Sequence, residues 1–377
     1  MDRFGIYVHI PFCKKKCKYC DFISFFGSDE KIDKYFNCLN KEIENSKYKN
    51  REVTTIYIGG GTPSLPNPEY ISNIINKISE NFKISENAEI TVEVNPGTVT
   101  KEKIESYKNS GVNRISIGLQ AIQNRLLKLI GRIHTYEEFL ESYNIIKNAG
   151  IDNINVDLML ALPTQTIEEL KDSVNEIIKI NPKHISLYSL ILEEGTELEK
   201  LVDDNKIELI DEKTEREMYW ETKKILEENG YNQYEISNFS KKGFESKHNM
   251  DCWNQEEYIG FGLAAHSYVE SKRFSNTENF DEYIKNIENN EYEKNIQLHE
   301  TQDREAKAKE FMMIGLRKIE GISISEFERR FRINPLFYFR FEIEKLVNED
   351  LIEVDLDNIK LTSKGLDLAN LVFEEFL

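Results

Sequence analysis

Cysteine is scarce in this sequence, and the few cysteines present are unevenly spread. The 377 residues include five cysteines, and three of them, Cys13, Cys17 and Cys20, lie within eight residues. A disulfide among these three would leave one cysteine over. A structural zinc site usually draws on two paired ligand sets, and no second C-x-x-C occurs. The scarcity therefore argues against a disulfide framework and against a closed zinc site.

Long apolar runs and an excess of positive charge are also missing. No early apolar run resembles a signal peptide, and no stretch of eighteen apolar residues occurs. We therefore expect a cytoplasmic protein with reduced thiols and no transmembrane segment, whose contact with a membrane would be peripheral and through a partner. The formal net charge is -18. Since nucleic-acid binding requires Lys and Arg to neutralise phosphates, no nucleic-acid partner is expected.

The cysteine group that is present has the spacing C-x3-C-x2-C, between Cys13 and Cys20. Cysteine thiolates hold iron–sulfur clusters, and three thiolates on a four-iron cluster leave one iron open to a small molecule. The lysines between the cysteines indicate a solvated loop rather than a core segment. An open zinc site with three protein ligands is the alternative that the spacing leaves. The spacing favours a [4Fe-4S] cluster.

The segment from Tyr7 to Phe22 reads Y-x-H-I-P-F-C-x3-C-x-Y-C-D-F and resembles radical S-adenosylmethionine (radical SAM) proteins. It is most similar to the branch that contains oxygen-independent coproporphyrinogen III oxidases and HemW-type heme chaperones. The resemblance implies a [4Fe-4S] cluster whose open iron is chelated by S-adenosylmethionine. In that family, an electron from the cluster cleaves the sulfonium and releases a 5′-deoxyadenosyl radical.

The first two thirds of the chain alternate short β-rich runs with longer helical patterns. Strands are predicted near 5–9, 55–58, 89–94, 114–118, 153–158 and 184–189. Helices are predicted over 29–46, 68–81, 100–110, 137–149 and 166–180. Such alternation predicts parallel strands with right-handed crossovers. The fold class is α/β, and the resemblance favours a partial (β/α)6 TIM-type barrel, with a doubly wound sheet as the alternative.

Three regions are expected along the chain. Residues 1–240 would form the barrel with the cluster and cofactor site, 241–300 a linker that carries a heme motif, and 301–377 a C-terminal winged-helix-like α+β domain. Helical runs are predicted there over 306–318, 324–331 and 336–349, followed by a hairpin of 351–354 and 359–362. Because acidic residues surround its arginines, we expect a lid or interaction domain rather than a DNA-binding one.

Candidate cofactor residues follow the predicted strands, where barrel active sites gather. Three consecutive glycines let a backbone approach a ligand closely. Glu93 ends an apolar strand, where an unpaired charge is costly, and Arg132 is suited to gripping a carboxylate. The resemblance implies an S-adenosylmethionine site made of Tyr7, Tyr19, Gly60, Gly61, Thr62, Glu93, Gln120, Arg132 and Asp157.

Three features separate the branches of the family. The oxidases carry a further cysteine where this chain has Phe22, and a long extension before the first strand, which only five residues precede here. The segment from His248 to Trp253 resembles the H-N-x-x-Y-W motif of the heme chaperones, with Cys252 in place of Tyr. Imidazole is a common heme ligand. The resemblance therefore implies that His248 and Trp253 contact heme, with Cys252 as a second candidate ligand.

The function that these features favour is a heme carrier on a radical-enzyme scaffold. It would bind a [4Fe-4S] cluster, S-adenosylmethionine and heme, and pass heme to acceptor proteins such as respiratory hemoproteins. A reductant protein such as flavodoxin or ferredoxin would supply electrons, and the basic loop Lys14–Lys18 adjoins the cluster. The alternative is oxygen-independent coproporphyrinogen III oxidase, an enzyme of oxidative propionate decarboxylation.

Overall fold

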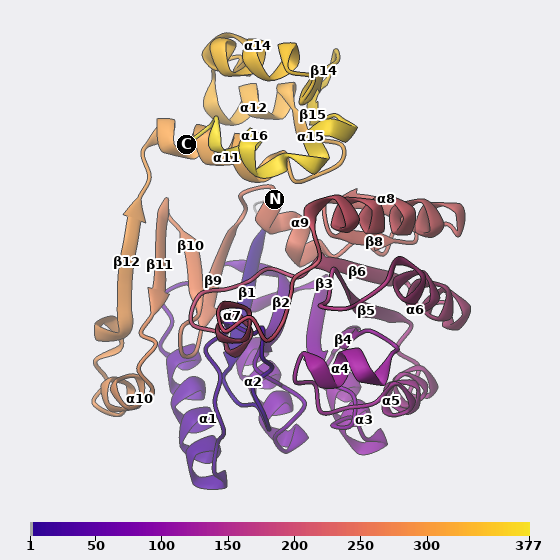
Figure 1. The fold of residues 1–377 in the computed structure, drawn as a ribbon. Helices are drawn as coiled ribbons and strands as arrows, with labels where there is room; N and C mark the ends of the chain where they lie inside the picture. Colours follow the sequence, from indigo (N-terminus) through magenta and orange to yellow (C-terminus); the bar gives the residue numbers. More distant parts are fainter. Residues whose placement is uncertain (1–2) are drawn as a thin grey trace.

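One large sheet organises the molecule, as a computed structural model that describes residues 3–377 shows. Six parallel strands pair in sequence order, with helices along their outer side (Figure 1). These strands are β1 (Phe4–Ile10), β2 (Glu52–Gly60), β3 (Lys83–Val94), β4 (Arg114–Gln120), β5 (Asn153–Leu160) and β6 (His184–Ser189). The order never reverses, as it would at the switch point of a doubly wound sheet, so the predicted partial barrel is confirmed.

The helices between the strands begin at residues that the sequence marks clearly. They are α1 (Asp29–Glu44), α2 (Pro68–Asn81), α3 (Lys101–Asn109), α4 (Asn124–Leu129), α5 (Tyr136–Asn148), α6 (Ile167–Ile180), α7 (Glu197–Asp203) and α8 (Glu212–Glu228). Thr135 and Thr166 each form a capping box with the glutamate three residues later. Such caps satisfy the backbone N–H groups that the first turn of a helix leaves free.

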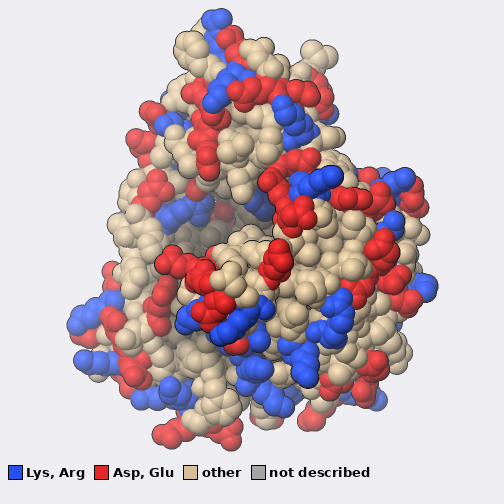
Figure 2. Space-filling model, viewed as in Figure 1, with Lys and Arg blue, Asp and Glu red and all other residues tan. Residues whose placement is uncertain are grey.

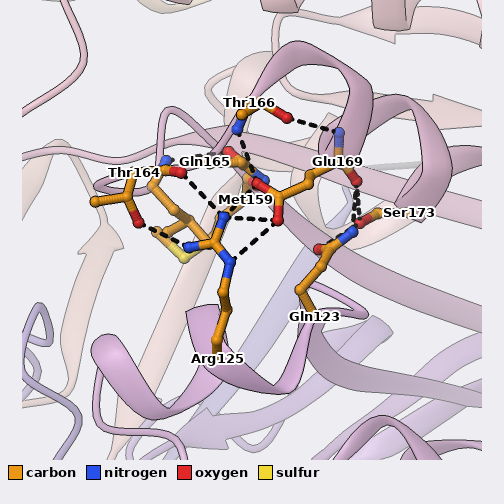
Figure 3. Close-up of polar contacts among 9 residues, drawn as sticks. Gln123, Arg125, Met159, Thr164, Gln165, Thr166, Glu169 and Ser173 are labelled. Atoms are coloured by element: carbon orange, nitrogen blue, oxygen red, sulfur yellow. Dashed lines mark hydrogen bonds and ion pairs between the residues drawn. The ribbon is translucent and has the colours of Figure 1, made fainter.

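A polar network holds the loop between β5 and α6 (Figure 3). Arg125 of α4 donates to Thr164 Oγ1 at 2.8 Å and to the carboxylate of Glu169, which also accepts from the N–H of Thr166 at 3.0 Å. The network fixes a strained backbone, since Ala161 and Thr164 have φ of 60° and 65°. The loop is thereby held in one conformation beside the carboxyl end of β5.

Both edges of the parallel sheet are extended by later strands. On the β6 side, β8 (Asn238–Ser240) pairs antiparallel with β6, and β7 (Asn232–Glu235) pairs antiparallel with β8. On the β1 side, β9 (Glu257–Phe261) pairs in parallel with β1. Beyond β9 come β10 (His266–Val269), β11 (Lys272–Asn276) and β12 (Ile296–Thr301), with α9 (Lys247–Trp253), α10 (Phe280–Glu288) and the 3₁₀ helix η1 (Tyr292–Asn295) between strands. Residues 241–300, expected as a linker, thus contribute strands to the main sheet.

A C-terminal unit with its own apolar cluster follows, drawn in yellow at the top of Figure 1. It consists of α11 (Arg304–Gly315), β13 (Ile322–Ser323), α12 (Ile324–Phe331), α13 (Pro335–Tyr338), α14 (Arg340–Asn348), β14 (Ile352–Val354), β15 (Asn358–Leu361), α15 (Ser363–Asp367) and α16 (Ala369–Glu374). The predicted hairpin is β14–β15, and β13 adds a third strand. The helix predicted over 336–349 is broken at Phe339, whose side chain packs in the unit's core.

Burial follows the pattern of a parallel sheet covered on both faces. Every residue of β4 is buried, and the outward residues Ile6 and Val8 of β1 are fully buried against the helices. The face of the molecule in Figure 2 is hollowed between the C-terminal unit and the barrel, and acidic and basic side chains are mixed over the rest of it. Within residues 3–377, no helix is both long and apolar enough to cross a membrane.

Candidate functional site

The three clustered cysteines lie on the loop that leaves β1. Backbone hydrogen bonds tie this loop to the rest of the barrel: Cys13 N donates to Phe25 O at 3.0 Å, and Lys18 N donates to Ile130 O at 3.0 Å. Thr62 N, just after β2, donates to Phe12 O at 2.8 Å. The loop is therefore fixed on several sides, which preorganises its thiols.

The glycines at the end of β2 allow the cysteine loop to approach the backbone of β2 closely. A Cβ on Gly61 would lie 2.8 Å from Phe12 O, and one on Gly60, whose φ is +107°, would lie 2.6 Å from the His9 ring. Real Cβ contacts do not come so close, so side chains here would push the cysteine loop away from β2. The glycine run thus seats the cysteine loop, and Gly60 and Gly61 also line the cavity beside it.

Cys13, Cys17 and Cys20 are free thiols that line one cavity of about 400 Å³. Burial raises the pKa of Cys20 to about 11, so in the absence of a metal this thiol stays protonated at neutral pH. Within residues 3–377, no three His, Cys, Asp or Glu side chains form a group suited to a single metal ion. A four-iron cluster is wider than one ion, and three cysteine thiols that line one cavity are the donor set that it takes.

Nearly all the residues predicted to bind S-adenosylmethionine line the same cavity. Tyr7 is the exception: its ring stacks on Tyr57 at 6.3 Å, and its hydroxyl lies 3.1 Å from His9 Nδ1 in a hydrogen bond. Lining the cavity with the cysteines are Tyr19, Gly60, Gly61, Thr62, Glu93, Gln120, Arg132 and Asp157.

Glu93 presents a buried carboxyl group to the cavity. Tyr57 Oη donates to it at 2.7 Å and Gly60 N at 3.3 Å. Burial is the main cause that raises its pKa, to about 7, and the nearby Asp157 contributes. Glu93 therefore changes charge near neutral pH, and as a carboxylate it can accept hydrogen bonds from ligand hydroxyl groups.

Arg132 crosses the mouth of the barrel beside the cysteines. Its Nη2 donates to Asn95 Oδ1 at 2.8 Å and to Gly118 O, and its Nη1 donates to Cys17 Sγ at 3.8 Å. Its Nε is buried without a partner. A guanidinium held this way has donor capacity left for an anionic group in the cavity, such as a carboxylate. Gln120 lies near it at a β-bulge, with φ of 76°.

Asp157 lies on the inner side of β5 in a polar layer. Asn155 Nδ2 donates to its Oδ1 at 2.7 Å and Ser116 Oγ to its Oδ2 at 3.3 Å. Burial raises the pKa of Asp157. The carboxyl group is thus oriented by strands β4 and β5, where it can accept hydrogen bonds from a ligand.

Sequence reasoning missed several cavity residues on the inner faces of the strands. Tyr57, Ser116, Asn155 and Ser186 line the cavity, as does Arg114, which is 2% exposed. The signal that could have found them is the two-residue period of a strand, since Ser116 shares a face with Gly118, and Asn155 with Asp157.

The residues of the predicted heme motif lie on α9; Asn249 lines the cysteine cavity, whereas His248 and Trp253 do not. His248 is buried: its Nδ1 forms a 2.9 Å hydrogen bond with Thr55 Oγ1, and its ring stacks on Tyr57 at 5.2 Å. The N–H of His248 donates to Glu89 at 3.2 Å, so α9 is seated toward the amino ends of β1–β3. Burial lowers the pKa of His248 to about 4 and keeps its imidazole neutral. Trp253 faces a different cavity, next to the C-terminal unit.

Known proteins resemble this chain over its whole length. Residues 7–177 match the Radical SAM superfamily, and residues 302–368 match the HemN C-terminal domain. The heme chaperone HemW of Lactococcus lactis is 38% identical over 371 residues, covering 98% of this chain and 96% of that protein. HemW of Bacillus subtilis is 36% identical over 376 residues, covering 98% of both.

A solved structure shows the same fold. Coproporphyrinogen III oxidase (HemN) from Escherichia coli superposes with a TM-score of 0.86 at 23% identity, covering 100% of this chain and 90% of that one. The fold is therefore that of a radical SAM barrel with a C-terminal domain, a family that implies a [4Fe-4S] cluster and S-adenosylmethionine. With two full-length relatives above 35% identity, the chain belongs to the HemW family of radical SAM proteins.

Proposed function

We propose that this protein is a heme chaperone: it holds a [4Fe-4S] cluster and S-adenosylmethionine, binds heme, and passes heme to acceptor hemoproteins. The observation that carries the proposal is the similarity to HemW proteins along 98% of the chain, which includes the barrel, α9 and the C-terminal unit. The presence of Phe22, where the oxidases have a further cysteine, supports the same choice.

In this proposal, Cys13, Cys17 and Cys20 hold the cluster. A bound [4Fe-4S] cluster supplies one electron at a time and an open iron for an amino acid chelate. The fixed loop and the glycines at the end of β2 support the assignment, because they hold the three cysteines at one cavity.

The residues around the cavity would bind S-adenosylmethionine by its polar ends. Arg132 and Gln120 would hold the methionyl carboxylate, Glu93 a ribose hydroxyl, and Gly60 and Gly61 the amino group through backbone atoms. Thr62, Tyr19 and Asp157 would complete the lining, and Tyr7 would act through its contacts with Tyr57 and His9. The unpartnered Nε of Arg132 supports a carboxylate at that end.

A reductant protein would dock on the exposed lysines of the cysteine loop and pass electrons to the cluster from there. Lys14, Lys15 and Lys16 are exposed and have no ion-pair partner among residues 3–377, whereas Lys18 lies 3.4 Å from Glu197. In a protein of net charge -18, this cluster gives local positive potential next to the thiols. An acidic reductant protein such as flavodoxin or ferredoxin fits it.

Heme would bind where α9 meets the C-terminal unit, with Trp253 beside it. Direct ligation of heme iron by His248 would require α9 to move away from β2, since the imidazole is stacked on Tyr57 and hydrogen-bonded to Thr55. His248 and Cys252 remain the candidate ligands of the motif.

The proposal is tested by titrating heme into anaerobically reconstituted protein. We expect saturable binding, transfer of heme to an apo-hemoprotein, and weaker binding by a His248→Ala variant. The matched control is His299→Ala, an exposed histidine on β12. Absence of heme binding by the wild type, or conversion of coproporphyrinogen III to protoporphyrinogen at useful rates with S-adenosylmethionine and a reductant, would refute the proposal in favour of the oxidase.

A further inference from the structure

A second cavity, of about 820 Å³, lies between the barrel and the C-terminal unit. Its walls come from the end of β6, from the β7–β8 turn, from α9 and from the α15–α16 region. Tyr188 and Asn249 line both this cavity and the cysteine cavity, so the two are neighbours. We call it the interface cavity.

Unpartnered buried polar atoms are concentrated around the interface cavity. Glu235 Oε2, Asn238 Oδ1, Trp253 Nε1 and Arg317 Nε all lack a hydrogen-bond partner, and all four residues line this cavity. Glu235 is almost wholly buried, with 1% of its side chain exposed. A buried donor or acceptor left unpaired costs about 1–3 kcal/mol, so four around one cavity indicate that a polar ligand completes them.

Arg317 has donor capacity left for a ligand in the interface cavity, since its Nε has no hydrogen-bond partner and its ion pair with Glu235 is long. Its Cζ lies 4.4 Å from the Trp253 ring centroid in a cation–π contact, and its Nη2 lies 4.0 Å from Glu235 Oε2. Burial raises the pKa of Glu235 and so weakens the negative charge opposite Arg317. Arg216, the other arginine in the cavity, is already paired with Asp367 at 3.1 Å.

Three large hydrophobic residues are exposed at the rim of the interface cavity, where Glu212 and Asn370 are the exposed polar residues. Ile191 is 64% exposed, Leu371 53% and Tyr188 40%, although all three are large hydrophobic residues. Apolar surface at the rim, above the guanidinium of Arg317, suits a flat amphiphilic ligand that carries carboxylates at one edge. A porphyrin with its propionates has this chemistry.

We propose that the interface cavity is the porphyrin site, with Arg317 binding a propionate carboxylate, the Trp253 N–H donating to the same group, and the macrocycle lying against the hydrophobic residues of the rim. The inference rests on the proposed heme function and gives it a location. Arg317 is thus a binding residue that the motif on α9 does not include. His248 would act on heme binding indirectly, by holding α9 and hence Trp253.

The test compares heme with heme dimethyl ester, in which both propionates are blocked. Reconstituted wild-type protein should bind heme about 10- to 100-fold more tightly than the ester, as expected for a hydrogen bond between charged groups. Arg317→Gln should weaken heme binding to the level of the ester and leave ester binding unchanged. Arg317→Lys should restore part of the difference.

The control is Arg340→Gln, an exposed arginine of the same unit that pairs with Glu344. Circular dichroism and the cluster absorbance verify that each variant is folded and loaded. If Arg317→Gln retains the wild-type preference for heme over the ester, the interface cavity is not the propionate site, while the heme function stands. If the wild type binds neither compound, the proposed function itself fails.

Discussion

Arg132 is the side chain whose removal should reveal most about the cofactor site. It donates to Asn95 Oδ1 at 2.8 Å and to Gly118 O, and these contacts hold its guanidinium beside Cys17. We predict that Arg132→Met greatly weakens the binding of S-adenosylmethionine to the reconstituted protein, because a methionyl carboxylate would lose its buried cation.

The magnitude follows from the burial of the pair. Truncating one partner of a buried, hydrogen-bonded charge pair costs about 2–5 kcal/mol, or about 30- to 5,000-fold in Kd. The free protein should also lose about 1–3 kcal/mol for each of the two oxygens, on Asn95 and Gly118, that the guanidinium satisfies. Arg132→Lys keeps the charge but loses the planar fork, so its effect on Kd should be intermediate.

Equilibrium dialysis of labelled S-adenosylmethionine against anaerobically reconstituted protein measures the Kd, and urea unfolding measures stability. The matched control is Arg340→Met: Arg340 is exposed on α14 and pairs with Glu344 four residues later, so its loss should change stability little and leave the Kd unchanged. A Kd for Arg132→Met within threefold of the wild-type value, with the cluster intact, would refute the assignment of Arg132 to the carboxylate.

Three further predictions concern the same cavity. Because burial raises the pKa of Glu93 to about 7, S-adenosylmethionine should bind more tightly as the pH rises through 7, and Glu93→Gln should abolish this dependence in dialysis. Folding stability should depend on pH in the opposite direction. Because the pKa of Glu93 is raised in the folded state, its contribution to stability is greatest below pH 4.5 and is lost as the pH rises to about 7. The unfolding curves of Glu93→Gln should lack this pH dependence. Cys17→Ser should lose the cluster absorbance, with Cys38→Ser, a buried helix cysteine, as control; full absorbance in Cys17→Ser would contradict the three-cysteine site. Reversing charge at Lys15 and Lys16 to Glu should slow cluster reduction by flavodoxin several-fold at low salt but not reduction by dithionite, and equal slowing by both would argue against a docking loop.

Local signals in the sequence were sufficient to predict the alternating strands and helices, whereas the choice of a barrel over a doubly wound sheet depended on the family resemblance. The helix α2 has the predicted bounds, and the capping boxes at Thr135 and Thr166 start α5 and α6 within one residue of prediction. These features depend on neighbours a few residues apart, which a single sequence displays. The cavity residues after each strand were predictable for the same reason, since the ends of parallel strands meet at one rim.

Long-range packing explains what the sequence did not predict. The parallel pairing of β9 with β1 joins Phe4 to Glu257 and has no local signature. The burial of His248 under Tyr57 likewise depends on α9 reaching the far end of the barrel. Trp253 and Arg317 meet across the boundary between the barrel and the C-terminal unit. Each of these contacts joins segments whose spacing in the chain gives no periodic pattern.

The place of β1 inside the sheet also affects the order in which the protein assembles during synthesis. The strand that carries the cysteine loop is synthesised before the other strands of the sheet, yet one of its two neighbours, β9, ends at Phe261. At about 5–20 residues per second, translation separates the two strands by about 10 to 50 s. Through that interval the backbone of β1 opposite β2 is an unpaired edge. During that time the cysteine thiols that follow β1 have only some of their final neighbours. We therefore expect a cluster to be inserted stably after the whole barrel has been released, rather than during its synthesis.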